Sequence, residues 1–248
     1  MKIIYDFDGT LTPYEIPQYK IIKQCGYDDA KLKEEMKKIM NDKNMTTYEA
    51  FYYTYEKILS ENNIPKNKHN ILLGCEEVKF NYGVIDFFEN FATKENGITN
   101  YVVTAGIEDY VKNTRISGYI DGIYGVQYKI VDGIYDKISF MLDGKQKPNI
   151  IKKIIRECDN ELIIYIGDGL TDEAAFEYVK SIGGYTIFVG SSEKDKENYL
   201  KLKEKGFVDQ YCSRDYSENS EIRKYIMMIN KNYIWLRFNK QLWGILTL

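Results

Sequence analysis

Residues 2–12 read Lys2-Ile3-Ile4-Tyr5-Asp6-Phe7-Asp8-Gly9-Thr10-Leu11-Thr12. The short apolar run has no 3.6-residue period, which predicts a strand buried on both faces, as at the centre of a parallel sheet. Because Asp is rare inside strands, Asp6 and Asp8 mark the carboxyl end of this strand, where open α/β sheets bind ligands. Gly9 and Thr10 then favour a tight turn away from the sheet.

Two carboxylates beside a glycine turn indicate a site for a divalent cation. Mg²⁺ prefers a few hard oxygen ligands, completed by waters and substrate phosphate. A carboxylate beside such an ion can attack phosphorus, and a second carboxylate can move the proton. An isolated Asp-x-Asp is also common as an ordinary strand-end turn, so the interpretation depends on the rest of the chain.

Composition limits the class of protein. The 248 residues, 44% of them hydrophobic, are enough for one large domain or a domain with an insertion. The net charge of -3 gives no basic field, so we expect no nucleic-acid partner. The four cysteines form no Cys-x-x-Cys pair, which favours reduced thiols. With no signal peptide and no apolar run long enough to span a bilayer, we expect a cytoplasmic protein without a membrane span.

Residues 14–83 have a different pattern from the first strand. Asp28 can cap one helix, and Thr46 with Glu49 forms a capping box ahead of a second. Apolar residues follow helical spacing in both segments. We therefore predict a small helical cap domain over 14–83, inserted into a discontinuous α/β core formed by 1–13 and 84–248.

The strand-helix pattern resumes after residue 83. A strand at 98–103 ends at Thr104, Ala105 and Gly106. Thr104, with free backbone N–H groups beside it at the following helix start, is placed to hold a phosphoryl oxygen, although a Thr-Ala-Gly loop alone is a weak signal. Glycines between β-prone pieces predict a hairpin or a short extended excursion over 120–140.

Charged residues mark two further positions. Lys147 precedes a helix, where a cation makes sense if it points at a phosphate or a carboxylate cluster, and Lys145 is the alternative. Either one could equally be an ordinary solvated surface lysine. A third buried strand at 162–166 is followed by Asp168, between two glycines, and by Asp172 in the first helical turn.

The last part of the chain completes the predicted sheet. Strands at 185–189 and 207–211 bring it to five or six strands. Residues 221–248 predict a helix followed by a segment rich in aromatic and basic residues, including Trp235, Phe238 and Trp243. This tail would pack onto the core or a partner copy, or lie on a membrane surface. The sequence leaves open whether the protein is a monomer or a homodimer.

At this point the sequence resembles the haloacid dehalogenase superfamily of phosphohydrolases. Residues 6–12 match its first motif, Thr104 its second, Lys147 its third and residues 167–172 its fourth. The first and fourth motifs are specific, whereas the second and third depend on their positions. The resemblance covers about residues 1–190 and implies a doubly wound, mainly parallel sheet with a Rossmann-like core, and a helical cap of the first type.

The resemblance also implies roles for individual residues. Asp6 would be the nucleophile, Asp8 the general acid and base, and Thr104 and Lys147 the groups that bind the transferring phosphoryl. The metal ligands would be Asp6, the main-chain carbonyl of Asp8, and Asp168, with Asp172 nearby through water. The implied activity is a Mg²⁺-dependent phosphatase that hydrolyses a small phosphorylated metabolite through an aspartyl-phosphate.

Phosphoserine phosphatase and its relatives are the most similar subgroup. Glu15 falls where those enzymes carry a substrate-binding glutamate, although it could equally be an ordinary charged residue entering a cap helix. They also use a cap arginine, whereas this chain has no arginine before Arg115. Phosphoserine therefore stays one candidate among small phosphate monoesters. A phosphotransferase or mutase of the same chemistry, and a non-catalytic binding or regulatory protein that keeps the fold, are the alternatives.

Overall fold

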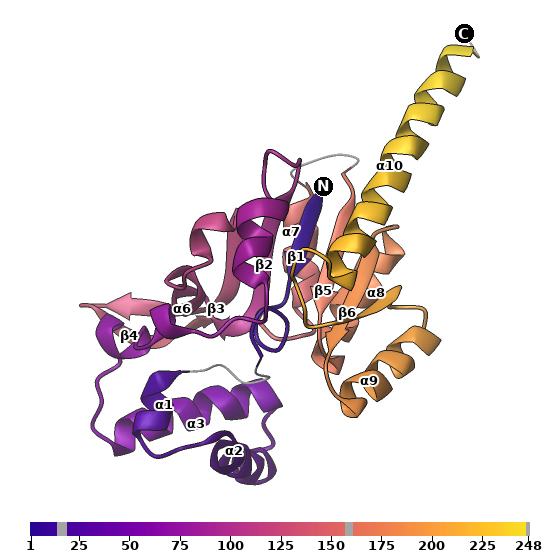
Figure 1. The fold of residues 1–248 in the computed structure, drawn as a ribbon. Coiled ribbons are helices and arrows are strands. Elements are labelled where there is room, and N and C mark those ends of the chain that lie inside the picture. The colour runs from indigo at the N-terminus through magenta and orange to yellow at the C-terminus, as the bar shows by residue number, and fades with distance from the viewer. Residues whose placement is uncertain (14–18, 157–160, 247–248) are drawn as a thin grey trace.

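The structure is a computed structural model that describes residues 1–13, 19–156 and 161–246, with side chains described up to residue 235. Within these ranges, seven strands form one sheet in the order β4-β3-β2-β1-β5-β6-β7 (Figure 1). The strands are β1 (Lys2–Tyr5), β2 (Thr99–Ile107), β3 (Gly122–Val131), β4 (Ile134–Phe140), β5 (Ile163–Gly167), β6 (Tyr185–Gly190) and β7 (Gln210–Ser213). All neighbours pair in parallel except β3 and β4, which form an antiparallel hairpin.

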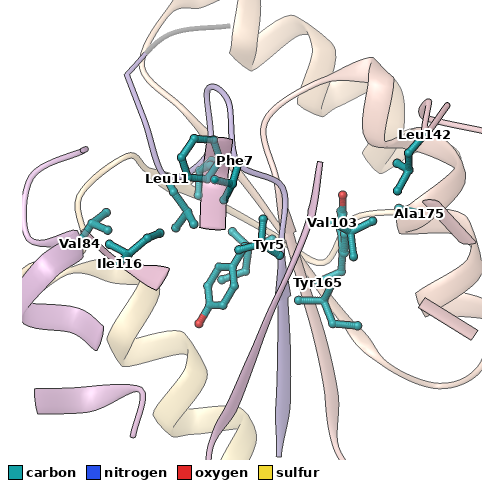
Figure 2. Packing of buried hydrophobic residues seen from close by; sticks show 14 of the residues in the cluster. Tyr5, Phe7, Leu11, Val84, Val103, Ile116, Leu142, Tyr165 and Ala175 are labelled. Atoms are coloured by element: carbon teal, nitrogen blue, oxygen red, sulfur yellow. The ribbon is translucent and has the colours of Figure 1, made fainter. Parts of the chain in front are cut away.

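Strand β1 lies at the centre of the sheet, as its composition predicts. It pairs in parallel with both β2 and β5, and Ile3, Ile4 and Tyr5 are fully buried. Figure 2 shows Tyr5 among the buried hydrophobic side chains that surround this strand. Because β2 and β5 flank β1 in register, the carboxyl ends of the three strands reach the same edge of the sheet.

Helices connect most of the strands. The α-helices are α1 (Lys20–Gln24), α2 (Asp29–Lys43), α3 (Thr47–Glu61), α4 (Lys68–Ile71), α5 (Val84–Asp86), α6 (Glu108–Lys112), α7 (Lys147–Arg156), α8 (Glu173–Ser181), α9 (Glu193–Glu204) and α10 (Glu221–Leu246). A π-helical turn (Phe87–Phe91) and short 3-10 turns (Cys75–Glu77, Ser117–Tyr119, Leu170–Asp172) complete the set.

Helices α1 to α4 all lie between β1 and β2 in the sequence. Both predicted caps are present: the Asp28 side chain accepts from the Lys31 amide at 2.8 Å, and Thr46 and Glu49 form the capping box of α3. In Figure 1, α1, α2 and α3 form a group beyond the carboxyl ends of the strands. Apolar side chains of these helices and of the strands belong to one buried cluster, so the helices pack directly against the part of the chain that forms the sheet. The exact domain boundaries, 14–83 against 1–13 and 84–248, stay a prediction.

Three details differ from the sequence predictions. The sheet has seven strands, because the 122–140 hairpin joins the parallel strands. The last strand is Gln210–Ser213 instead of 207–211, since the preceding residues close a turn after α9. Strand β2 continues through Thr104 to Ile107, so the next helix begins only at Glu108.

Helix α10 begins against the core and then projects from it (Figure 1). Ile222, Ile226 and Ile229 are buried, and the Arg223 guanidinium pairs with Asp86. Further along, Trp235 is 66% exposed. Phe238 and Trp243 lie beyond the described side chains, so the predicted contact of this tail stays a prediction. No helix in the described ranges has the length and apolar character needed to cross a membrane.

Candidate active site

Four of the predicted residues come together at the carboxyl edge of the sheet. Asp6 and Asp8 follow β1, Thr104 lies in β2, and Asp168 follows β5. They line one cavity of about 390 Å³, together with Lys147 at the start of α7. This convergence follows from the strand order, because β1, β2 and β5 are neighbours that run in the same direction.

Lys147 connects the first and last of the predicted motifs. Its side chain is 2% exposed, and its Nζ donates to Asp6 Oδ1 and to Asp172 Oδ1, both at 2.6 Å. The Tyr165 hydroxyl also donates to Asp172 Oδ1 at 2.6 Å. Lys145, in contrast, is exposed. The structure therefore selects Lys147 as the lysine that offsets the carboxylate charge.

Asp172 holds the loop that follows β5. It is fully buried, and its Oδ2 accepts from the Asp168 amide at 3.1 Å. The same carboxylate thus joins the loop backbone to Lys147 and Tyr165. Its orientation is determined by these contacts, which keep Asp168 at the cavity.

The pKa values of Asp6 and Asp8 are both raised, but by different surroundings. Burial raises the pKa of Asp6 to about 6, against the opposing effect of the nearby Lys147 ammonium. Burial and the charge of Asp6 raise the pKa of Asp8 well above its ordinary value. Burial alone would lower the pKa of Lys147, but the carboxylates of Asp172 and Asp6 outweigh it and raise that pKa. A raised pKa favours the protonated form of Asp8, which is the form that a general acid requires.

Three buried carboxylates offer a place for a cation. One oxygen each from Asp6, Asp168 and Asp172 lies within 4.8 Å of the others. Burial, followed by the charges of Asp6 and Asp172, raises the pKa of Asp168, as expected where anionic charge is crowded. Hard oxygen donors in this number fit Mg²⁺. Asp8, by comparison, is not in the cluster through its side chain, which agrees with a ligand role limited to its main-chain carbonyl.

Gly9 makes the close approach of the first and fourth motifs possible. Its φ is +78°, and a Cβ at this position would lie 2.1 Å from Asp168 Oδ2. Both the left-handed backbone and the lack of space therefore require glycine. The Thr10 hydroxyl lies 3.4 Å from Asp168 Oδ1 on the same side.

Thr104 is at the cavity but not at a helix N-terminus. Its Oγ1 accepts from the Gly106 amide at 2.9 Å, and the residue is 1% exposed. Ala105 and Gly106 also line the cavity. The expected helix start was wrong because the backbone stays extended to Ile107. A phosphoryl group would therefore meet the Thr104 hydroxyl and strand backbone instead of a helix terminus.

Arg214 and Asp195 complete the site and were not predicted. Arg214 Nη2 lies 3.2 Å from Asp168 Oδ2 and 3.4 Å from Asp195 Oδ2. Asp195 also caps α9 by accepting from the Ser191 and Ser192 amides. The Ser192–Asp195 spacing is a capping signal that the sequence offers. Nothing local marks Arg214, which follows β7.

The helical insertion supplies the opposite wall of the cavity. Met36 of α2 and Thr47, Tyr48 and Phe51 of α3 line it. Burial raises the pKa of Tyr48 to about 12, while a hydrogen bond with Thr171 acts in the opposite direction. Glu15, the predicted substrate ligand, lies outside the described residues.

The metal-free protein should lose stability as the pH rises from about 4 to about 6. The folded pKa of Asp6, about 6, lies above its ordinary value of 3.8, so the folded state binds more protons across this window and the free energy of unfolding falls. We expect a component on the order of 1–3 kcal/mol. It should be absent from Asp6→Asn. Melting temperatures in chelator between pH 4 and 7 test this, and identical pH profiles for the two proteins would contradict it.

Comparison with solved structures identifies the class of this fold. A HAD family hydrolase from Salmonella enterica subsp. enterica serovar Typhi matches with a TM-score of 0.63 at 13% identity, over 89% of this chain and 72% of that one. The chain therefore has the fold of the haloacid dehalogenase hydrolases. The predicted α/β fold class is confirmed.

Phosphoserine phosphatases are among the structures that share the fold. A substrate-bound phosphoserine phosphatase complex matches with a TM-score of 0.62 at 18% identity, over 92% of this chain and 97% of that one. A phospho-aspartyl intermediate analogue of phosphoserine phosphatase matches over the same shares at 18% identity, with a TM-score of 0.58. At the level of sequence, no family model and no curated protein matches the chain.

Proposed function

We propose that the protein is a Mg²⁺-dependent phosphatase that hydrolyses a small phosphate monoester through an aspartyl-phosphate at Asp6. One observation supports this proposal more strongly than the others. A buried ammonium, Lys147 Nζ, lies 2.6 Å from Asp6 Oδ1 at the edge of a cavity that also holds Asp8, Thr104 and Asp168. Nucleophile, acid, phosphoryl ligand and metal ligand are thus within reach of one bound phosphate.

The first half-reaction transfers the phosphoryl group to the protein. An Asp6 carboxylate oxygen attacks phosphorus, and the bond from phosphorus to the leaving oxygen breaks. Asp8, whose raised pKa favours its protonated form, gives its proton to that oxygen and becomes a carboxylate. The Lys147 ammonium and the Thr104 hydroxyl offset the charge on the phosphoryl oxygens.

The second half-reaction returns the protein to its starting state. Asp8 takes a proton from water, whose oxygen attacks phosphorus, and the bond to Asp6 breaks to release inorganic phosphate. Asp6, Asp168 and the Asp8 carbonyl would hold the ion, with Asp172 orienting the loop. When bound, Mg²⁺ supplies Lewis-acid stabilisation of the phosphoryl charge.

The cavity wall favours a small organic leaving group. Met36, Thr47, Tyr48 and Phe51 present an uncharged surface opposite Asp6. Lys194 of α9 is the cation besides Lys147 in the described lining. Phosphoserine stays a candidate substrate, with Lys194 in place of an arginine and with the loss of bidentate geometry. The helices over 14–83 would act as the cap that closes over it.

Phosphate release tests the proposed function directly. We expect wild-type protein with Mg²⁺ to release phosphate from members of a panel of alkyl, aryl, sugar and amino-acid phosphates that includes phosphoserine. Excess chelator should stop release, and Mg²⁺ should restore it. Separately, Mg²⁺ with inorganic phosphate should raise the melting temperature, because ligands that bind only the folded state stabilise it. Full activity in chelator would contradict the metal assignment. No phosphate release from any member of the panel, together with no shift in melting temperature, would contradict catalysis.

A further inference from the structure

Strand β2 is irregular beside the candidate site. Its pairing with β3 shifts register between Val103 and Ile107. Two backbone groups of this segment are bonded by tyrosines from the helical insertion. Tyr52 Oη donates to the Ala105 carbonyl at 2.7 Å, and the Ile107 amide donates to Tyr19 Oη at 2.8 Å.

The two tyrosines are hydrogen-bonded to each other as well as to the strand. Tyr19 and Tyr52 are each 2% exposed. Burial raises the pKa of Tyr52 well above its ordinary value, and a hydrogen bond with the Tyr19 hydroxyl acts in the opposite direction. Tyr19 accepts from Ile107, and Tyr52 donates to Ala105, so the pair holds the irregular segment at its middle and at its carboxyl end. Water has little access to replace either bond.

The bridged segment lies against the acid of the proposed reaction. A Cβ at Gly106 would lie 3.3 Å from Asp8 Oδ2, 3.3 Å from Thr104 Oγ1 and 3.5 Å from Tyr19 Oη. Since these atoms surround Gly106 closely, a displacement of its backbone would change its distances to Asp8 Oδ2 and to Thr104 Oγ1, which accepts from the Gly106 amide. The bridge therefore acts on the part of the cavity that would bind the phosphoryl group.

We propose that Tyr19 and Tyr52 are positioning residues. When the helical insertion is packed over the site, they hold the Thr104–Ile107 segment in the position that binds the phosphoryl group. Tyr52 lies on α3, which also supplies Thr47, Tyr48 and Phe51 to the cavity wall, so the same hydrogen bonds couple the position of α3 to the phosphoryl-binding strand. The role rests on the proposed function, because it is the phosphoryl group that this segment would bind.

Removal of single hydroxyl groups tests this role, and the chain provides a matched control. Tyr52→Phe and Tyr19→Phe each remove one bond and keep the ring. Tyr55, also on α3, is fully buried, and its hydroxyl has no hydrogen-bond partner among the described residues, so Tyr55→Phe controls for loss of a buried hydroxyl. We expect Tyr52→Phe and Tyr19→Phe to lower kcat/KM roughly three- to tenfold, the usual effect of one hydrogen bond, with a lower kcat at saturating substrate. Tyr55→Phe should stay within about twofold of wild type.

A second measurement separates this role from the proposed function. Hydrogen exchange at the Ile107 amide should be faster in Tyr19→Phe and Tyr52→Phe than in wild type or Tyr55→Phe, whether or not a substrate is known. Unchanged exchange, or the same kinetic loss in all three variants, would overturn the positioning role. If wild type releases no phosphate, the proposed function fails, and the exchange result alone decides whether the tyrosines hold the segment.

Discussion

Asp6→Asn should abolish turnover while the protein stays folded. The amide cannot form the aspartyl-phosphate, so the covalent route is lost, and we expect a decrease of roughly 10⁴-fold or more in kcat. Stability should change little. Lys147 keeps its contact with Asp172 at 2.6 Å, and the variant removes one of the buried carboxylates that crowd the site. The melting temperature should stay within a few degrees of wild type.

The measurement combines kinetics with detection of the intermediate. Phosphate release is compared for wild type, Asp6→Asn and Asp132→Asn. Asp132 is exposed at the turn of the β3–β4 hairpin with φ of +50°, a conformation that Asn also tolerates, so it controls for the chemical change. Mass spectrometry of acid-quenched wild type should find the phosphoryl group on Asp6. Turnover by Asp6→Asn close to wild type would exclude Asp6 as the nucleophile.

Lys147→Met should cost both activity and stability. The lysine is 2% exposed and lies between Asp6 and Asp172, so its removal leaves two buried carboxylates without their cation. Breaking such a buried arrangement costs about 3–5 kcal/mol. The phosphoryl group would also lose a charge that stabilises it in the transition state, which we expect to lower kcat by roughly 10²–10³-fold.

Lys145→Met is the matched control for this variant. The same substitution is made two residues earlier, at an exposed side chain, and should leave both stability and kcat near those of wild type. The pH provides a further check. The destabilisation of Lys147→Met should be greatest near neutral pH and smaller near pH 5, because protonation of Asp6 removes one of the uncompensated charges. Equal effects of the two substitutions would show that Lys147 has no special role.

The outline of this protein could be predicted from local sequence patterns. The apolar run before Asp6 predicted a central buried strand, and the caps at Asp28 and Thr46 predicted two helices that the structure confirms. Local patterns succeed here because strand burial and helix capping depend on neighbouring residues. The order of the parallel strands then brings the acids together at one edge of the sheet.

Other features were decided only by the tertiary structure. The choice of Lys147 over Lys145 depends on where α7 begins and how it packs, because Lys147 is its first residue and its side chain reaches Asp6, whereas Lys145 lies in the turn before the helix and is exposed. Arg214 reaches Asp168 from 46 residues away, and no spacing rule connects them. The tyrosine pair that holds the irregular segment of β2 depends on how the helical insertion packs on the sheet. The sequence by itself determined the elements and the acids at the strand ends, whereas contacts between distant segments required the packed chain, because they arise from its three-dimensional geometry.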